Sequence, residues 1–137
     1  MTSIRAGFAI LFFLCISSIN AFAKIGDTIA QCDSLYGRPQ FTDANGSRGY
    51  LGWNGYALMV DFKGGIANEM SYRKMSQDSA GTSSPISGSE INQILWATHS
   101  GWKSNGVVSG FETYLTTDGK FFAAYDPVNH ILEIGIK

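Results

Sequence analysis

The sequence predicts an α+β domain in which two α-β-β-β repeats share one antiparallel sheet, with both helices packed on one face. Three observations predict this fold. Two amphipathic stretches begin with a capping-box pattern, alternating segments separated by turn residues follow each stretch, and the two sets of segments align with each other. Because one helix and three strands bury little apolar surface alone, we expect the repeats to share their sheet.

The first 23 residues have the features of a secretory signal peptide. Arg5 is followed by an apolar run over residues 6–19, and the tripeptide Ala-Phe-Ala at 21–23 resembles a cleavage site. We therefore expect cleavage before Lys24 and a single exported domain, periplasmic or extracellular, over residues 24–137.

An uncleaved membrane anchor and a lipoprotein are the alternatives to cleavage. The apolar run is too short to span a bilayer comfortably. Leu14 is not the small residue that a lipobox places before its cysteine, which would be Cys15 here. We therefore expect no stable membrane anchor after cleavage.

The charge of residues 24–137 argues against two classes of partner. Nine Lys and Arg residues face eleven Asp and Glu residues once Arg5 has left with the signal peptide. This slightly acidic balance gives no electrostatic reason to bind nucleic acid or an anionic membrane surface.

The first helix is predicted over Ile29–Tyr36. Thr28 and Gln31 form a capping box at its start. Gly37 is expected to end the helix as a left-handed C-cap, and Pro39 cannot continue it.

Cys32 has no intramolecular partner once the signal peptide is removed, so its role needs an explanation. A core position, an intermolecular disulfide and a reactive thiol are the alternatives. No His lies nearby in sequence to activate a thiolate. We favour a core position, because at 100° per residue the apolar stripe of this helix consists of Ile29, Cys32, Leu35 and Tyr36.

The second helix follows another capping box, formed by Ser87 and Glu90, and Ile86 can pack on Ile91 as a hydrophobic staple. Gly101 is expected to end this helix. Trp96 falls outside the predicted buried face, which consists of Ile91, Ile94, Leu95 and Thr98.

Between the helices the pattern changes to that of strands. Asn54-Gly55 is a two-residue hairpin signal, and Lys63-Gly64-Gly65 suits a three-residue turn with a glycine bulge. A two-residue turn there would place Glu69 opposite Val60 on the apolar face, so we predict the longer turn. Its register pairs Phe62 with Ile66, Val60 with Asn68, Leu58 with Met70, and Tyr56 with Tyr72. The other face then carries Ala57, Met59, Asp61, Ala67, Glu69, Ser71 and Arg73.

The region after the second helix repeats this scheme. Asp118-Gly119 predicts a two-residue turn and residues 126–129 a four-residue turn. Aligning the halves defines repeat one as residues 24–74, a linker as 75–86 and repeat two as 87–137. In repeat two one face is expected to carry Phe121, Ala123, Tyr125, Leu132, Ile134 and Ile136.

Residues 26–39, GDTIAQCDSLYGRP, resemble a motif of known families. They match the pattern G-x-[ST]-x-x-[EQ]-V-x-x-x-[LY]-G-x-P of BamE-like and beta-lactamase inhibitor protein-like tandem domains, with Cys32 at an apolar position. The whole domain also resembles small exported bacterial proteins of unknown function that have a second helix similar to SEINQILW. The chain departs from these families in lacking a lipobox and a G-x-P exit in repeat two. The resemblance implies binding of proteins or cell-envelope components through the sheet face that helices leave uncovered.

An enzyme is the alternative function, as a small secreted hydrolase that would use His99 or His130. Two histidines without zinc-motif spacing make a poor metal site. No acidic pair has the spacing of a glycosidase, and the glycines mark turns rather than a phosphate-binding loop. We therefore predict a non-enzymatic protein with no cofactor and no metal.

The favoured hypothesis is a binding or inhibitory module that uses the uncovered sheet face. A sizeable exposed apolar patch usually marks an interface, and the partner would be another protein or a second copy. Cover by Trp53, Trp102 or the 75–89 loop, or a register shifted by one residue, would remove this face. The predicted binding residues are Met59, Phe111, Leu115 and Phe122, with Ala57 and Ala124 beside them.

Overall fold

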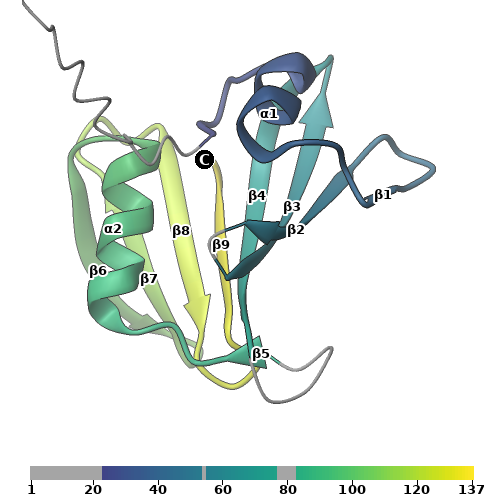
Figure 1. Ribbon diagram of the computed structural model, residues 1–137. Coiled ribbons are helices and arrows are strands. Elements are labelled where there is room, and N and C mark those ends of the chain that lie inside the picture. The colour runs from purple at the N-terminus through teal and green to yellow at the C-terminus, as the bar shows by residue number, and fades with distance from the viewer. Residues whose placement is uncertain (1–22, 54, 77–82) are drawn as a thin grey trace, which may run out of the picture.

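The computed structural model describes residues 23–53, 55–76 and 83–137, which form an α+β fold with two helices and one nine-stranded antiparallel sheet (Figure 1). Neither helix in these ranges combines the length and the apolar character needed to cross a bilayer. The elements are, in chain order, α1 (Ile29–Tyr36), β1 (Phe41–Thr42), β2 (Arg48–Trp53), β3 (Tyr56–Lys63), β4 (Ile66–Met75), β5 (Ser83–Ser84), α2 (Gly88–Thr98), β6 (Trp102–Val108), β7 (Phe111–Thr116), β8 (Phe121–Asp126) and β9 (Ile131–Ile136).

The strands follow the order β1-β2-β3-β4-β9-β8-β7-β6, and β5 pairs with β4. One shared antiparallel sheet was predicted and is confirmed, with β4 and β9 side by side at its centre. The expectation of three strands after each helix is wrong, because β1–β5 follow α1 and β6–β9 follow α2. The sequence pattern missed β6 because all of its residues except Trp102 are exposed, which leaves no apolar alternation to detect.

Both helices begin as predicted. In α1, Gln31 N donates to Thr28 Oγ1 at 3.2 Å and Thr28 N donates to Gln31 Oε1 at 2.8 Å, and Ser87 and Glu90 form the same capping box in α2. The helix ends differ from the expectations. Gly37 has φ 81° but ψ −167°, which lies outside the left-handed helical region, and α2 ends at Thr98, before Gly101.

One hydrophobic cluster contains the buried residues of both helices and of one sheet face. Cys32 is fully buried in it, as predicted, and burial raises the pKa of its thiol to about 11. Trp96 is 56% exposed, as its position outside the stripe predicts, and Trp102 lies in the core rather than over the second face of the sheet. The predicted buried face of α2 is confirmed for Ile91, Ile94, Leu95 and Thr98.

Each helix is also held to a strand by an acidic side chain. Asp33 of α1 accepts hydrogen bonds from Arg48 Nη1 at 2.8 Å and from Tyr50 Oη at 2.7 Å, both on β2. Glu90 of α2 accepts one from Lys74 Nζ of β4 at 2.6 Å. These contacts fix the helices relative to the sheet.

The β3–β4 register differs from the prediction. Lys63 pairs with Ile66 around a two-residue turn, and a bulge then shifts the register so that Val60 lies opposite Met70 and Leu58 opposite Tyr72. The bulge lies at Asn68, which has no partner on β3. It reverses the alternation, so Ala67 is buried instead of lying on the second face, while Glu69 stays off the apolar face. Asn54, in the predicted preceding turn, lies outside the described residues.

In the second half the predicted shared face is confirmed by pairs of Phe121 with Ile136, Ala123 with Ile134 and Tyr125 with Leu132. Ile136, at the end of β9, is 50% exposed. Leu115 pairs with Phe122, as the Asp118-Gly119 turn predicts. The next turn comprises residues 127–130 rather than 126–129, because Asp126 pairs with Ile131. His130 in this turn has φ 57°. Of the linker predicted at 75–86, residues 77–82 lie outside the described part of the chain.

Candidate binding face

The candidate site lies on the sheet face opposite the buried cluster, which we call the outer face. Its residues alternate with core residues along each strand. For example, Ala57 and Met59 of β3 alternate with the buried Tyr56, Leu58 and Val60. From the other strands of the outer face come Ser71 and Arg73 of β4, Ile131 and Glu133 of β9, Phe122 and Ala124 of β8, and Leu115 of β7.

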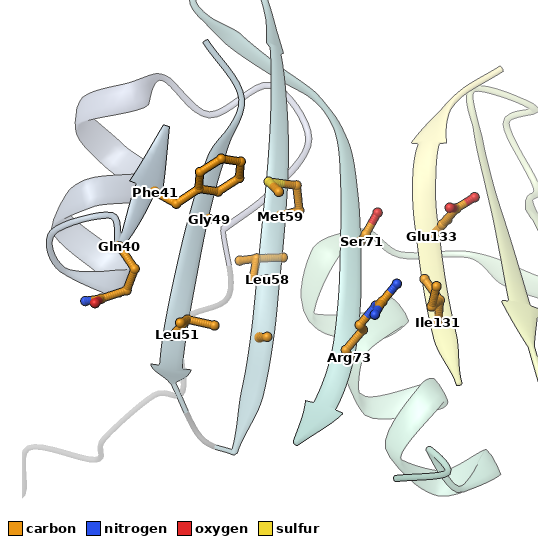
Figure 2. A pocket seen from close by; sticks show the side chains of 11 residues that line it. Gln40, Phe41, Gly49, Leu51, Leu58, Met59, Ser71, Arg73, Ile131 and Glu133 are labelled. Atoms are coloured by element: carbon orange, nitrogen blue, oxygen red, sulfur yellow. The ribbon is translucent and has the colours of Figure 1, made fainter. Parts of the chain in front are cut away.

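A hollow of about 380 Å³ opens on the outer face over β1, β2, β3, β4 and β9 (Figure 2). Its β1–β3 side is mainly apolar. The opposite side combines three polar or charged side chains with one apolar side chain, namely Ser71, Arg73, Glu133 and Ile131. The lining side chains used below are Phe41, Leu51, Ala57, Met59, Ser71, Arg73, Ile131 and Glu133.

Gly49 shapes one wall of this hollow. It pairs directly with Phe41 across β1 and β2, and a Cβ added to Gly49 would lie 2.9 Å from Cδ1 of the Phe41 ring. The ring therefore lies over the glycine, where a larger residue would displace it. Figure 2 shows Phe41 and Met59 on either side of Gly49. Phe41 remains 49% exposed and Leu51 57% exposed, so both present apolar surface to a partner.

A second apolar group lies on β6–β8. Leu115 and Phe122 are half-buried neighbours on β7 and β8. Phe111 is 42% exposed and pairs with Val108, which is 52% exposed. Gly135 lies under the ring of Phe122, since an added Cβ would be 3.0 Å from Phe122 Cε1.

The structure places the four predicted binding residues in two separate groups. Met59 lines the hollow, whereas Phe111, Leu115 and Phe122 belong to the group on β6–β8. A polar strip on the two central strands lies between them, because these strands present Glu69, Ser71, Arg73 and Glu133 on the outer face.

The polar strip carries more acidic than basic side chains. Burial, and after it the negative charges of Glu133 and Asp61, raise the pKa of the Glu69 carboxyl. Asp61 pairs with Glu69 across β3 and β4. Because these carboxylates repel each other, positive charge from a partner would be stabilised beside the hollow.

The two histidines of the enzyme hypothesis lie at opposite ends of β8. His99 Nε2 is 3.1 Å from Asp118 Oδ2, and its ring contacts Phe121 at a centroid distance of 4.5 Å. His130 Nδ1 is 3.2 Å from the carbonyl oxygen of Ser83. The fold therefore does not bring the two together. Within the described residues, no three His, Cys, Asp or Glu side chains converge as a metal site would require.

Sequence reasoning missed most of the hollow. Phe41 lies on β1, a strand that was not predicted, and Leu51 lies on β2, whose residues were not assigned to a face. Arg73 and Glu133 had the right alternation, but their strands were not known to be neighbours. The sequence did contain a signal for these two residues. Arg73 follows Tyr72 and Glu133 precedes Ile134, and because Tyr72 and Ile134 are buried, alternation places Arg73 and Glu133 on the outer face.

Comparisons with known proteins give little further information. No protein-family model matches the chain, and no curated protein matches it significantly. The chain is similar to the solved structure of a DUF4309 family protein, YjgB, from Bacillus subtilis subsp. subtilis str. 168. That similarity has a TM-score of 0.46 and 11% sequence identity over 81% of this chain and 79% of the other. Similarity at this level carries no inference about activity.

Proposed function

We propose that this chain is an exported, non-enzymatic binding or inhibitory domain that captures a protein partner through its outer face. The hollow over β1–β4 and β9 is the observation that supports it best. Its volume is within the range of ligand pockets, and the apolar residues Phe41 and Leu51 at its margin are about half exposed.

The chemistry of the hollow favours a polypeptide over a small metabolite. Apolar side chains on the β1–β3 side would accept an aliphatic or aromatic side chain of the partner. Arg73 and Glu133 on the opposite side would pair with polar groups next to that side chain. A protein segment that carries one apolar and one charged residue supplies both contacts.

The relation between the two halves of the chain and the position of the two helices are part of the same proposal. The chain consists of two related halves, each a helix followed by strands, and both helices cover one sheet face and leave the outer face open. The capping boxes at Thr28 and Ser87 support the relation between the halves. The single buried cluster that contains residues of both helices supports their position on one face.

Export rests on the sequence of the first 23 residues, which combines a positive charge, a short apolar run and an Ala-Phe-Ala end. Cleavage before Lys24 would place the domain in the periplasm or outside the cell. A partner would then be an envelope protein, another secreted protein or a second copy.

The test is capture from envelope extract with immobilised residues 24–137. In the hollow variant, Phe41 and Leu51 are both changed to Ser. Its control changes Val128 and Trp96 to Ser, since these are 81% and 56% exposed and lie away from the hollow. We expect a partner to bind the parent and the control, and to bind the hollow variant at least about tenfold more weakly. Equal binding to all three, with unchanged thermal unfolding, would contradict the proposal.

A further inference from the structure

At the junction where cleavage is expected, a tight turn over residues 24–27 brings a backbone nitrogen to a carboxylate. Asp27 N donates to Lys24 O at 3.0 Å, and Gly26, the third residue of this turn, has φ 98°. The same turn lets Lys24 N donate to Asp27 Oδ2 at 2.7 Å. The nitrogen that cleavage would release as a free amine is therefore already in contact with an acidic side chain.

This turn is attached to the sheet by contacts that cleavage does not touch. Gly26 N donates to Ala67 O, and Ala67 N donates to Asp27 O, both at 2.8 Å. Ile25 packs against the core cluster. All of these contacts involve residues after the junction, so removing residues 1–23 leaves the position of Asp27 intact.

We propose that Asp27 is the binding site for the α-ammonium group that cleavage before Lys24 creates. In that reaction water hydrolyses the Ala23–Lys24 amide, the carboxylate remains on Ala23, and the Lys24 nitrogen gains the protons of an ammonium group. The neutral N–H donor at Asp27 becomes a cationic donor, and charge-assisted hydrogen bonds are stronger than neutral ones. The inference rests on the proposed export, because only a processed chain has this group.

Cleavage also removes a contact. Ala23 is fully buried, and its backbone N donates to Tyr36 Oη at 2.6 Å. Tyr36 also forms a hydrogen bond with Tyr72, so its hydroxyl keeps a partner. The ion pair at Asp27 thus offsets part of what the fold loses with Ala23.

The groups that sense the charge of Asp27 do not compete for it. Within the described part of the chain, they are Cys32 and Tyr36 of α1. Burial, more than Asp27, raises the pKa of Cys32 to about 11 and that of Tyr36 to about 12. Both are neutral at physiological pH, which leaves Asp27 to the new ammonium group.

The pH dependence has a definite sign. A nearby carboxylate raises the pKa of the α-ammonium group in the folded state above its ordinary value of about 8. The stabilisation is therefore fully present below about pH 8 and is lost as the pH rises through the raised folded-state value.

The test compares two forms of the protein, one that begins at Lys24 and one with Ala23 restored in front of it. Each is made with Asp27 and with Asp27→Asn. At pH 6.5 we expect Asp27→Asn to lower the Tm by about 3–6 °C more in the form that begins at Lys24. That difference should disappear above about pH 10. Asp61→Asn, at an exposed acid on β3, is the control and should affect both forms equally.

Two outcomes are decisive, and they separate this inference from the proposed export. An equal effect of Asp27→Asn in both forms would overturn the ammonium site, whatever the cell does with the chain. The intact mass of the exported protein tests the export separately. We expect a chain that begins at Lys24, and a chain that keeps Ala23 or the whole leader would overturn the processing.

Discussion

Gly135→Ala tests whether the outer face is shaped by an aromatic ring packed on a glycine. Gly135 lies on β9, and a Cβ there would be 3.0 Å from Cε1 and 3.2 Å from Cζ of Phe122. Overpacking of this kind costs about 1–3 kcal/mol. Ala in place of Gly within a strand returns about 0.5–1 kcal/mol. We therefore expect the free energy of unfolding to fall, by up to about 2.5 kcal/mol.

The same substitution in a Phe122→Ala background removes the steric conflict. There Gly135→Ala should be neutral or stabilising by up to about 1 kcal/mol, so the two changes should be coupled. Urea unfolding of residues 24–137, followed by tryptophan fluorescence, measures all four proteins of the cycle.

The control for this cycle is Gly88→Ala at the start of α2, where an added Cβ has nothing within 4 Å. It should stabilise both backgrounds by the same amount, up to about 1 kcal/mol. If Gly135→Ala costs the same with and without the Phe122 ring, the packing described for this face is refuted.

Three further predictions concern the core, the α2 cap and the second apolar group. Cys32→Ala should cost about 1–2 kcal/mol through lost packing, and in the folded parent Cys32 should resist a bulky thiol reagent that labels it only after denaturation. The hydrogen bond from Lys74, followed by those at Ser87, lowers the pKa of Glu90 to about 2. The stabilisation of the fold by ionised Glu90 is therefore fully present above the unfolded pKa of about 4.3 and is lost as the pH falls towards 2. Glu90→Gln should flatten the pH dependence of Tm between these values. An unchanged slope would contradict this prediction. Changing Leu115 and Phe122 together to Ser should lower the free energy of unfolding by about 1–3 kcal/mol, because both are half-buried, and should weaken partner capture less than the hollow variant. Equal weakening would show that one interface includes both apolar groups.

The sequence alone determined the features that depend on neighbours within about four residues. The two capping boxes, the helix α1 from Ile29 to Tyr36 and the burial of Cys32 all follow from helical spacing and side-chain chemistry. The core faces of β3 and β8 follow from alternation in the same way. These signals are local, so no knowledge of the rest of the fold was needed to read them.

Tertiary structure decided which strands are neighbours. Pairing of β4 with β9 joins segments about 60 residues apart, and it places Arg73 and Ser71 beside Ile131 and Glu133. As a result, the polar strip on β4 and β9 separates the predicted apolar face into two groups. Ile131 and Glu133 of β9 complete the lining of the hollow. Alternation assigns a residue to a face but does not say which strand lies beside it, because strand order depends on long-range packing of the whole sheet.

The bulge at Asn68 and the strand β6 have the same cause. A two-residue turn at Gly64-Gly65 looked incompatible with the apolar pattern, but one extra residue restores the alternation and keeps Met70 and Tyr72 in the core. The β6 strand forms because β7 supplies hydrogen-bond partners to a segment with almost no buried side chains. In both places backbone pairing with a neighbouring strand, which no local sequence pattern encodes, determined the structure.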